Sequence, residues 1–526
     1  MRAPVSEALA ARVAELRDRA EALGRRSRET AIGSTSLGIE RAALRLLGVD
    51  GLDAHGRPLA ATVVDRLAAL GPERFGGGIA LPFAVAAVEY DLGPQELALE
   101  VASGHVDLGL EAGMLEIPER RGQAERALGR WTEVAFARFD ANRTARHELS
   151  DALGEPAGPW LGAWLTPPTS DEAGAEIAVL AAAGADLLLV PVPAVHEWTV
   201  SVESLSDELG PDLSPPPSGS QRGLSRLRAA LDESAAERGA YARLATVTDA
   251  LGAPEQAVVA GFERVDVVLA DPLEEIAAGV EPERALADHA AAHALLRRSG
   301  TALVLGAGPL LVGPELARGE AADAATRAGR AIAGQAVAVA LARASGLPAR
   351  ELIAGAPAET GEAGPGRFPV ALADLHVRRL LHPDLAFAHL EPADVEPGGW
   401  CADLQAWLAV GGEPRLIQRR GRPLEFHERA EPARVVAQAA AATRAALLGP
   451  AGPRAPVRLA GPAAEMALRI ADAAIATLQL VAADGWRSLI GVPATIDESG
   501  EAPRLGGTGL VARRGYGGPL DRGPLL

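Results

Sequence analysis

The feature that most constrains the fold is a strand–helix–strand unit in the middle of the chain, residues 261–308. Residues 265–271 (VDVVLAD) form a short run of β-branched and aliphatic residues, and residues 301–308 (TALVLGAG) form a second. Between them, residues 282–298 carry alanine and leucine at three- and four-residue spacing. Continuous apolar runs are typical of strands buried on both faces of a parallel sheet, and the helical period is typical of a covering helix.

The same unit recurs on both sides, from Trp160 to about residue 450. We predict eight strands, each followed by a helix, because right-handed βα repetition over this length is typical of a (β/α)8 TIM barrel, an α/β fold. A doubly wound open sheet is the alternative. The predicted strands are residues 160–166, 186–193, 240–247, 265–271, 301–306, 351–355, 385–390 and 414–418. The predicted helices are residues 171–183, 222–238, 253–262, 282–298, 320–345, 368–381, 400–410 and 431–447.

The barrel pattern has an extension on each side, which predicts three regions. Residues 1–155 form an N-terminal helical region in which no strand is convincing, and residues 156–450 form the barrel. Residues 451–526 form a C-terminal extension with one helix, residues 461–483, and a Gly-rich tail that contains LGGTGLVARRGYGGPL.

Charge and composition exclude several classes of function. The formal net charge is -18, which argues against nucleic acid or an anionic membrane as the main partner. The single cysteine, Cys401, excludes an intrachain disulfide. We see no signal peptide and no apolar run long enough to span a membrane, so we expect a cytoplasmic protein. The sequence contains no lysine, and therefore this chain alone cannot form a lysine Schiff base.

A histidine pair lies within the predicted helix at residues 282–298. His289 and His293 are four residues apart, with Asp288 adjacent, which is the spacing of helical zinc sites. No third ligand is evident, and the helix should lie on the outside of the barrel. We therefore expect two surface histidines and no metal site.

Polar residues and glycines follow several predicted strands, at the carboxyl-terminal mouth where barrel enzymes carry their chemistry. Carboxylates and imidazoles there could act as acids or bases or hold a polar substrate, and a glycine turn could present N–H groups to a phosphate. The alternative is that they cap helices and end strands. The candidate site residues are His196, Asp249, Asp271, Gly306, Gly308, His389, Glu391 and Arg420.

Two stretches come near the Asp-x-His-x-x-Gly motif with which some domains bind cobalamin. They are Asp53–His55 and Asp374–His376, but Pro58 and Arg379 stand where the motif has glycine. The chain therefore has no recognisable cobalamin ligand of its own.

Four segments resemble the α subunit of cobalamin- and pyridoxal phosphate (PLP)-dependent D-lysine 5,6-aminomutase, and the resemblance extends over nearly the whole chain. These segments are Ile39–Asp65, Gly184–Val190, Arg264–Leu273 and the terminal Leu505–Leu510. The resemblance implies a barrel whose mouth holds PLP, and a smaller β subunit that brings adenosylcobalamin and the Schiff-base lysine. The reaction it implies is a radical 1,2-shift of an amino group. The absence of lysine and of a cobalamin motif fits an α subunit.

The positions that hold PLP in this family are changed. By the resemblance, an arginine and a serine of the phosphate site correspond to Val192 and Glu197, and a ring-stacking tyrosine corresponds to Glu274. Charge-assisted contacts to phosphate are the strong ones, so losing several should abolish ordinary PLP binding. The other changed positions are Asp249 for a serine, Gly279 for an arginine, Gly308 for an aspartate, and Leu390–Ala393 for a Pro-Pro-Thr-Lys segment.

Two hypotheses follow from the resemblance and its exceptions. The chain is a diverged aminomutase subunit that works with a cobalamin-binding β subunit, or it is a non-catalytic paralogue that acts as a scaffold or regulator of a mutase. In neither case do we expect activity from this chain alone. The sequence is also compatible with a homo-oligomer of this chain.

Overall fold

The structure is a computed structural model of the whole chain. It describes residues 5–111, 115–156, 159–165, 170–192, 221–248, 252–277, 280–306, 322–356, 367–391, 406, 415–419, 459–486 and 509–514. The predicted helices at 400–410 and 431–447 lie outside the described residues, apart from Ala406.

Eight parallel strands form a closed barrel, with each strand paired to the next and β2 paired to β9. The TIM-barrel prediction is therefore confirmed, and the open-sheet alternative is wrong because no edge strand remains. All eight predicted strands are present. They are β2 Trp160–Trp164, β3 Leu187–Val192, β4 Arg243–Thr248, β5 Val267–Leu269, β6 Ala302–Leu305, β7 Leu352–Ala356, β8 Ala386–Glu391 and β9 Leu416–Arg419.

Side chains alternate between two cores along these strands, as the two faces of a strand require. One cluster fills the barrel interior and includes Leu189, Val304 and Ala388. A larger cluster lies between the sheet and the outer helices and includes Leu188, Leu305 and Phe387. The outer layer consists of α9 Ser170–Ala182, α12 Gln221–Arg238, α13 Ala253–Phe262, α14 Pro272–Ala277, α15 Pro282–Ser299, α17 Ala324–Ala344 and α18 Arg367–Leu381, with a short 3-10 helix η2 Ala349–Glu351.

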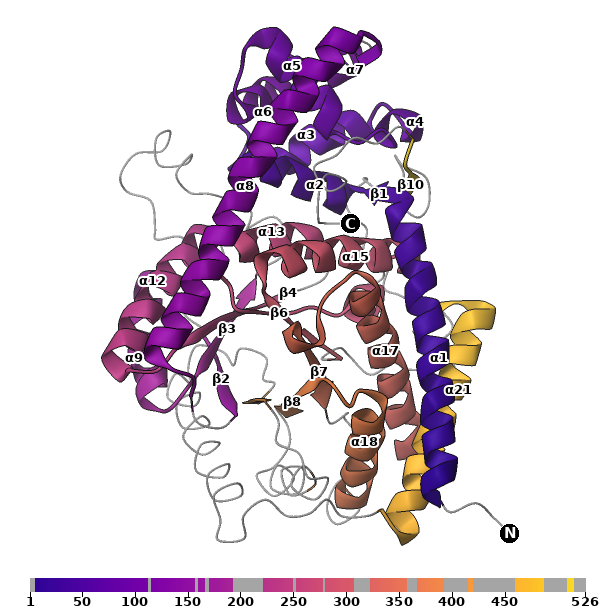
Figure 1. The fold of residues 1–526 in the computed structure, drawn as a ribbon. Coiled ribbons are helices and arrows are strands. Elements are labelled where there is room, and N and C mark those ends of the chain that lie inside the picture. Colours follow the sequence, from indigo (N-terminus) through magenta and orange to yellow (C-terminus); the bar gives the residue numbers. More distant parts are fainter. Residues whose placement is uncertain are drawn as a thin grey trace.

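The N-terminal residues form a helical region that lies over one side of the barrel (Figure 1). Its longest helix, α8, runs from these helices down to the barrel, and the region has its own apolar core. The helices are α1 Val5–Ile32, α2 Leu37–Leu46, α3 Leu59–Ala68, α4 Pro72–Phe75, α5 Ala80–Tyr90, α6 Pro94–Ser103, α7 Leu108–Glu111 and α8 Pro118–Leu153.

The two ends of the chain meet in a small antiparallel sheet. Strand β1 Ser34–Ser36 pairs with β10 Leu510–Ala512, with Thr35 opposite Val511. The expectation of no strand in the first 150 residues is therefore wrong. Because β1 has three residues and a partner at the other end of the chain, no local alternation marks it in the sequence. The region boundaries at residues 155 and 450 stay a prediction.

The C-terminal helix α21 Gly461–Asp484 runs beside α1 along the barrel (Figure 1). Its length and composition pass the test for a membrane-spanning helix, with a mean hydropathy of 1.5 in its most apolar window, 44% of which is buried in the structure. It is the one such helix in the described residues. Arg469 and Asp472 interrupt its apolar residues, so it is not the uninterrupted apolar run that the sequence analysis looked for. In the structure its apolar face packs against α1, α17 and α18 and includes Ile470, Ile475 and Leu478.

A buried arginine, Arg146, is one of the polar contacts that attach helix α8 to the barrel. The Arg146 guanidinium donates to the carbonyl oxygens of Val265 (2.7 Å), Ser299 (3.2 Å) and Gly300 (2.7 Å). It also lies 3.0 Å from Asp266 Oδ1. These residues come just before β5 and β6, so this part of α8 lies at the amino-terminal ends of the strands, opposite the mouth.

Candidate active site

The structure describes part of the barrel mouth. Of the candidate residues, Asp271, Gly306, His389 and Glu391 are described, while His196, Asp249, Gly308 and Arg420 lie outside the described residues, as does the side chain of Glu391.

Asp271 joins the ends of two neighbouring strands. Its Oδ2 accepts a hydrogen bond from the Gly306 amide at the end of β6 (2.8 Å). Its Oδ1 accepts from the Leu273 amide in the first turn of α14 (2.9 Å). The side chain is 3% exposed. In this arrangement Asp271 caps a helix and holds the β5 and β6 ends together, as the alternative interpretation of the candidates expects.

A polar network that the sequence analysis did not find lies behind these strand ends. Gln335 Nε2 donates to the carbonyl oxygens of Leu305 (3.2 Å) and Gly355 (2.7 Å). The Arg378 guanidinium donates to Gln335 Oε1 (2.7 Å) and to Asp374 Oδ2 (2.9 Å). All three side chains are buried. The four-residue spacing of Asp374 and Arg378 on one helix is a sequence signal that could have found part of this network.

His389 is fully buried but does not line the barrel interior. Its neighbour Ala388 belongs to the interior cluster, and Phe387 belongs to the cluster between sheet and helices. Because side chains alternate along a strand, His389 points toward the helices. Among the four described candidates, Asp271 and Gly306 are in direct contact.

The described part of the mouth does not fit a PLP phosphate. The Gly306 amide, the N–H group that could have faced a phosphate, donates to Asp271. Three carboxylates, those of Asp271, Glu274 and Glu275, follow β5 within five residues. Phosphate binding requires free N–H donors and positive charge, and this segment supplies neither.

The histidine pair is not on the surface, which corrects the sequence expectation. His289 and His293 are 1% and 0% exposed because the outer face of α15 is covered by α1, β1 and α8. Their rings meet edge to face with centroids 5.9 Å apart, and His289 Nε2 lies 3.2 Å from Glu275 Oε1. No group of three metal-ligating side chains is found in the described residues.

Burial sets the charge state of this cluster. Burial and the neighbouring His289 lower the pKa of His293 well below its ordinary value, so His293 is neutral. Burial also opposes the charged form of His289, but the carboxylates of Glu275, Asp271 and Asp288 outweigh it and raise the pKa of His289. The cluster is a buried structural contact between the barrel and the N-terminal region.

Comparison with known families decides what kind of barrel this is. Residues 8–400 match the family described as the D-lysine 5,6-aminomutase TIM-barrel domain of the alpha subunit. The chain belongs to this family. The resemblance seen in the sequence is thus confirmed, and the closed barrel described above is the family's domain.

Two curated relatives carry the name lysine 5,6-aminomutase alpha subunit. The one from Fusobacterium nucleatum is 26% identical over 364 residues, which cover 68% of this chain and 66% of the relative. The one from Acetoanaerobium sticklandii is 28% identical over 265 residues, which cover 50% of this chain and 48% of the relative. The chain thus matches 48% to 66% of the length of these relatives.

Among solved structures, dihydropteroate synthases align over about half of this chain. The enzyme from Stenotrophomonas maltophilia has a TM-score of 0.32 and 15% identity, and covers 55% of this chain and 94% of its own. The enzyme from Yersinia pestis has a TM-score of 0.31 and 12% identity, over 54% of this chain and 94% of its own.

Proposed function

We propose that this chain is the barrel subunit of an adenosylcobalamin-dependent aminomutase and catalyses a radical 1,2-shift of an amino group together with a smaller cobalamin-binding β subunit. Membership of the α-subunit family over residues 8–400 is the observation that carries this proposal. A partner is required because the chain has no lysine for a Schiff base and no complete cobalamin motif. The family name suggests lysine degradation in the cytoplasm as the setting.

The proposed enzyme does not hold PLP by the family's phosphate contacts. Two features support this: the carboxylate-rich segment after β5, and the Gly306 amide that is occupied by Asp271. A dianionic phosphate near Asp271 and Glu274 would be repelled rather than neutralised. We therefore derive no catalytic step through PLP in this chain.

The same observations favour a second function, that of a non-catalytic paralogue. A barrel that keeps its framework and loses its cofactor contacts can still bind the partners of its catalytic relatives. In that case the chain would act as a scaffold or regulator of a mutase.

Titration of PLP into the purified protein, with and without the β subunit, separates the two functions. The visible absorbance of the bound cofactor is the readout, and the alpha subunit from Acetoanaerobium sticklandii is the positive control. Saturable binding at micromolar concentration would contradict the loss of the phosphate contacts and support a PLP-dependent aminomutase. Absence of binding in both conditions, together with no amino-group shift in the complex, would support the paralogue.

A gain-of-function variant tests whether the lost contacts explain the loss of PLP binding, and a second variant is its matched control. Val192→Arg with Glu274→Tyr restores two residue types that the resemblance assigns to the PLP site. If the barrel has lost only these contacts, the double variant should bind PLP more tightly than the native chain, whereas a Val192→Leu variant should not.

A further inference from the structure

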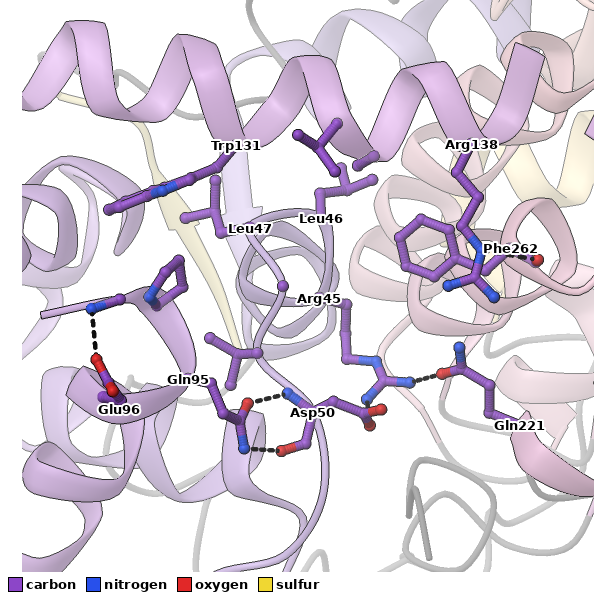
Figure 2. Close-up of a pocket in the computed structure, with 16 residues that line it drawn as sticks. Arg45, Leu46, Leu47, Asp50, Gln95, Glu96, Trp131, Arg138, Gln221 and Phe262 are labelled. Atoms are coloured by element: carbon purple, nitrogen blue, oxygen red, sulfur yellow. Dashed lines mark hydrogen bonds and ion pairs between the residues drawn. The ribbon is translucent and has the colours of Figure 1, made fainter. Parts of the chain in front are cut away.

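A groove of about 590 Å³ lies between the N-terminal helices and the barrel, on one side of α8 (Figure 2). Trp131 points from α8 toward Leu47 at one end, and Phe262 lies beside Arg138 at the other. Val134 also lines it and is 73% exposed, more than any other large hydrophobic side chain in the described residues. A groove of this size, lined by half-buried aromatic side chains and an exposed valine, is typical of a binding surface.

The two arginines that line this groove are paired with neighbouring carboxylates. The Arg45 guanidinium pairs with Asp50 and donates to Gln221 Oε1. Arg138 lies 2.8 Å from Glu263 Oε1, and its guanidinium stacks over Phe262 at 4.8 Å. The groove therefore offers an apolar surface between two compensated arginines, and the Glu96 carboxylate at its edge accepts a hydrogen bond from the Gly93 amide (3.0 Å).

A second cavity of about 470 Å³ continues along α8, and both cavities are lined by Gly93 and Trp131. Arg126 and Arg130 line it, one helical turn apart, against the single carboxylate of Asp91. Both arginines are exposed, and neither has an ion pair or hydrogen bond with any residue in the described part of the chain. These two cations lie next to the apolar groove, in a chain whose net charge is -18.

We propose that these two cavities together form the docking site for an acidic segment of the β subunit. An apolar side chain of that segment would occupy the groove against Trp131 and Val134, and carboxylates beside it would pair with Arg126 and Arg130. Tryptophan and arginine are the residues most enriched at the energetic centres of interfaces. The inference rests on the proposed function, because that function supplies the partner.

Two observations favour the β subunit over a second copy of this chain. Homodimers are mostly twofold symmetric, and a twofold contact through this surface would bring one arginine pair toward the other. In addition, no lining residue of either cavity belongs to a barrel strand. Arg146, further along α8, contacts the amino-terminal side of β5 and β6, so a segment bound here leaves the mouth uncovered.

The test is the affinity between the purified full-length chain and the cobalamin-binding β subunit from the same genome, measured by calorimetry at low and high salt. We expect the double variant Arg126→Glu with Arg130→Glu, and separately Val134→Asp, to weaken binding at least about tenfold. For the native pair we expect affinity to fall as salt rises, and for the arginine variant this dependence should be largely lost.

Matched controls separate docking from folding and from net charge. Arg26→Glu with Arg74→Glu makes the same charge change on α1 and α4, and Val179→Asp makes the same polarity change at an exposed position of α9. These controls should bind like the native chain, and all variants should keep its thermal unfolding midpoint. Equal binding by the groove variants would overturn this site but leave the complex intact. No binding by the native chain would overturn both the site and the proposed partnership, and a native homodimer broken by the groove variants would assign the site to a second copy.

Discussion

Gly306 ends β6 in a backbone conformation that side chains rarely adopt. Its φ is +77°, and a Cβ atom added there would lie 2.2 Å from Gln335 Nε2. The same residue donates its amide to Asp271. The glycine is therefore required by the packing of the strand end against the Gln335 network.

Gly306→Ala should lower the free energy of unfolding by about 2–4 kcal/mol, because left-handed strain and overpacking act together. Gly239→Ala is the control, since Gly239 has a similar φ of +67° but no atom within 4 Å of the added Cβ. The control variant should lower the free energy of unfolding by about 1 kcal/mol. Urea unfolding of both variants measures the difference, and equal losses would show that the Gln335 contact is unimportant.

Asp288 is a buried carboxyl group at the contact between α15 and the N-terminal region. Burial raises its pKa to about 6, the Arg284 guanidinium opposes this rise, and the charge of Glu275 adds to it. Ser36 donates its hydroxyl to Asp288 Oδ1. The pKa of Asp288 is higher in the folded than in the unfolded protein. Between these two pKa values, therefore, the carboxyl group of Asp288 is protonated in the folded state and ionised in the unfolded state.

The free energy of unfolding should therefore fall as pH rises from about 4 to about 6, by at most about 3 kcal/mol from this group. Asp288→Asn keeps an acceptor for Ser36 and does not titrate. We expect the stability difference, native minus variant, to be largest near pH 4 and to shrink toward pH 7, as measured by urea unfolding at each pH. Parallel pH profiles of the two proteins would contradict a raised pKa at this position.

Helix α8 connects the N-terminal helices to the barrel, and Arg146 is the buried arginine among its polar contacts there. Three carbonyl oxygens and the carboxylate of Asp266 share this one side chain. A buried acceptor that loses its charged donor lowers the stability of the folded state, because water cannot reach the acceptor to replace the lost hydrogen bond.

Arg146→Met should lower the free energy of unfolding by about 3 kcal/mol or more. Arg143→Met on the same helix should cost less than about 1 kcal/mol, because Arg143 is exposed and lies 3.8 Å from Asp140 Oδ1. Chemical denaturation followed by circular dichroism gives both values. A loss at Arg143 as large as that at Arg146 would mean that helix propensity, rather than the carbonyl contacts, is responsible.

At the scale of the whole molecule, the pairing of β1 with β10 joins the two ends of the chain. Ser34 and Ala512 are opposite each other in this ladder. Directly opposite residues have Cα atoms about 4.5–5.5 Å apart, a separation that a disulfide spans.

The double variant Ser34→Cys with Ala512→Cys, in a Cys401→Ser background, should therefore form a disulfide on mild oxidation. Ser34→Cys with Arg513→Cys is the matched control, because adjacent strand residues point to opposite faces and this pair should stay reduced. Mobility on a non-reducing gel and mass spectrometry of the linked peptide report the bond. Equal oxidation of both pairs would contradict the register.

The candidate site was only partly predictable from sequence. Asp271 and Gly306 follow predicted strands, and neighbouring strand ends meet at one mouth, so their proximity could be expected. The hydrogen bond between them, which removes the amide from phosphate binding, depends on the turn geometry of two separate loops. The face of the sheet on which the His389 side chain lies depends on the register of β8, and a shift of one residue would move it to the opposite face.

The sequence by itself determined the barrel and the family. The eight strands and their helices are encoded locally, because a strand buried on both faces is continuously apolar and a covering helix repeats with its own period. Only the tertiary structure decided that His289 and His293 are buried, that β1 pairs with β10, and that α8 carries a groove beside two unpaired arginines. These features arise where segments distant from one another in the chain meet, and such contacts leave no periodic pattern in either segment.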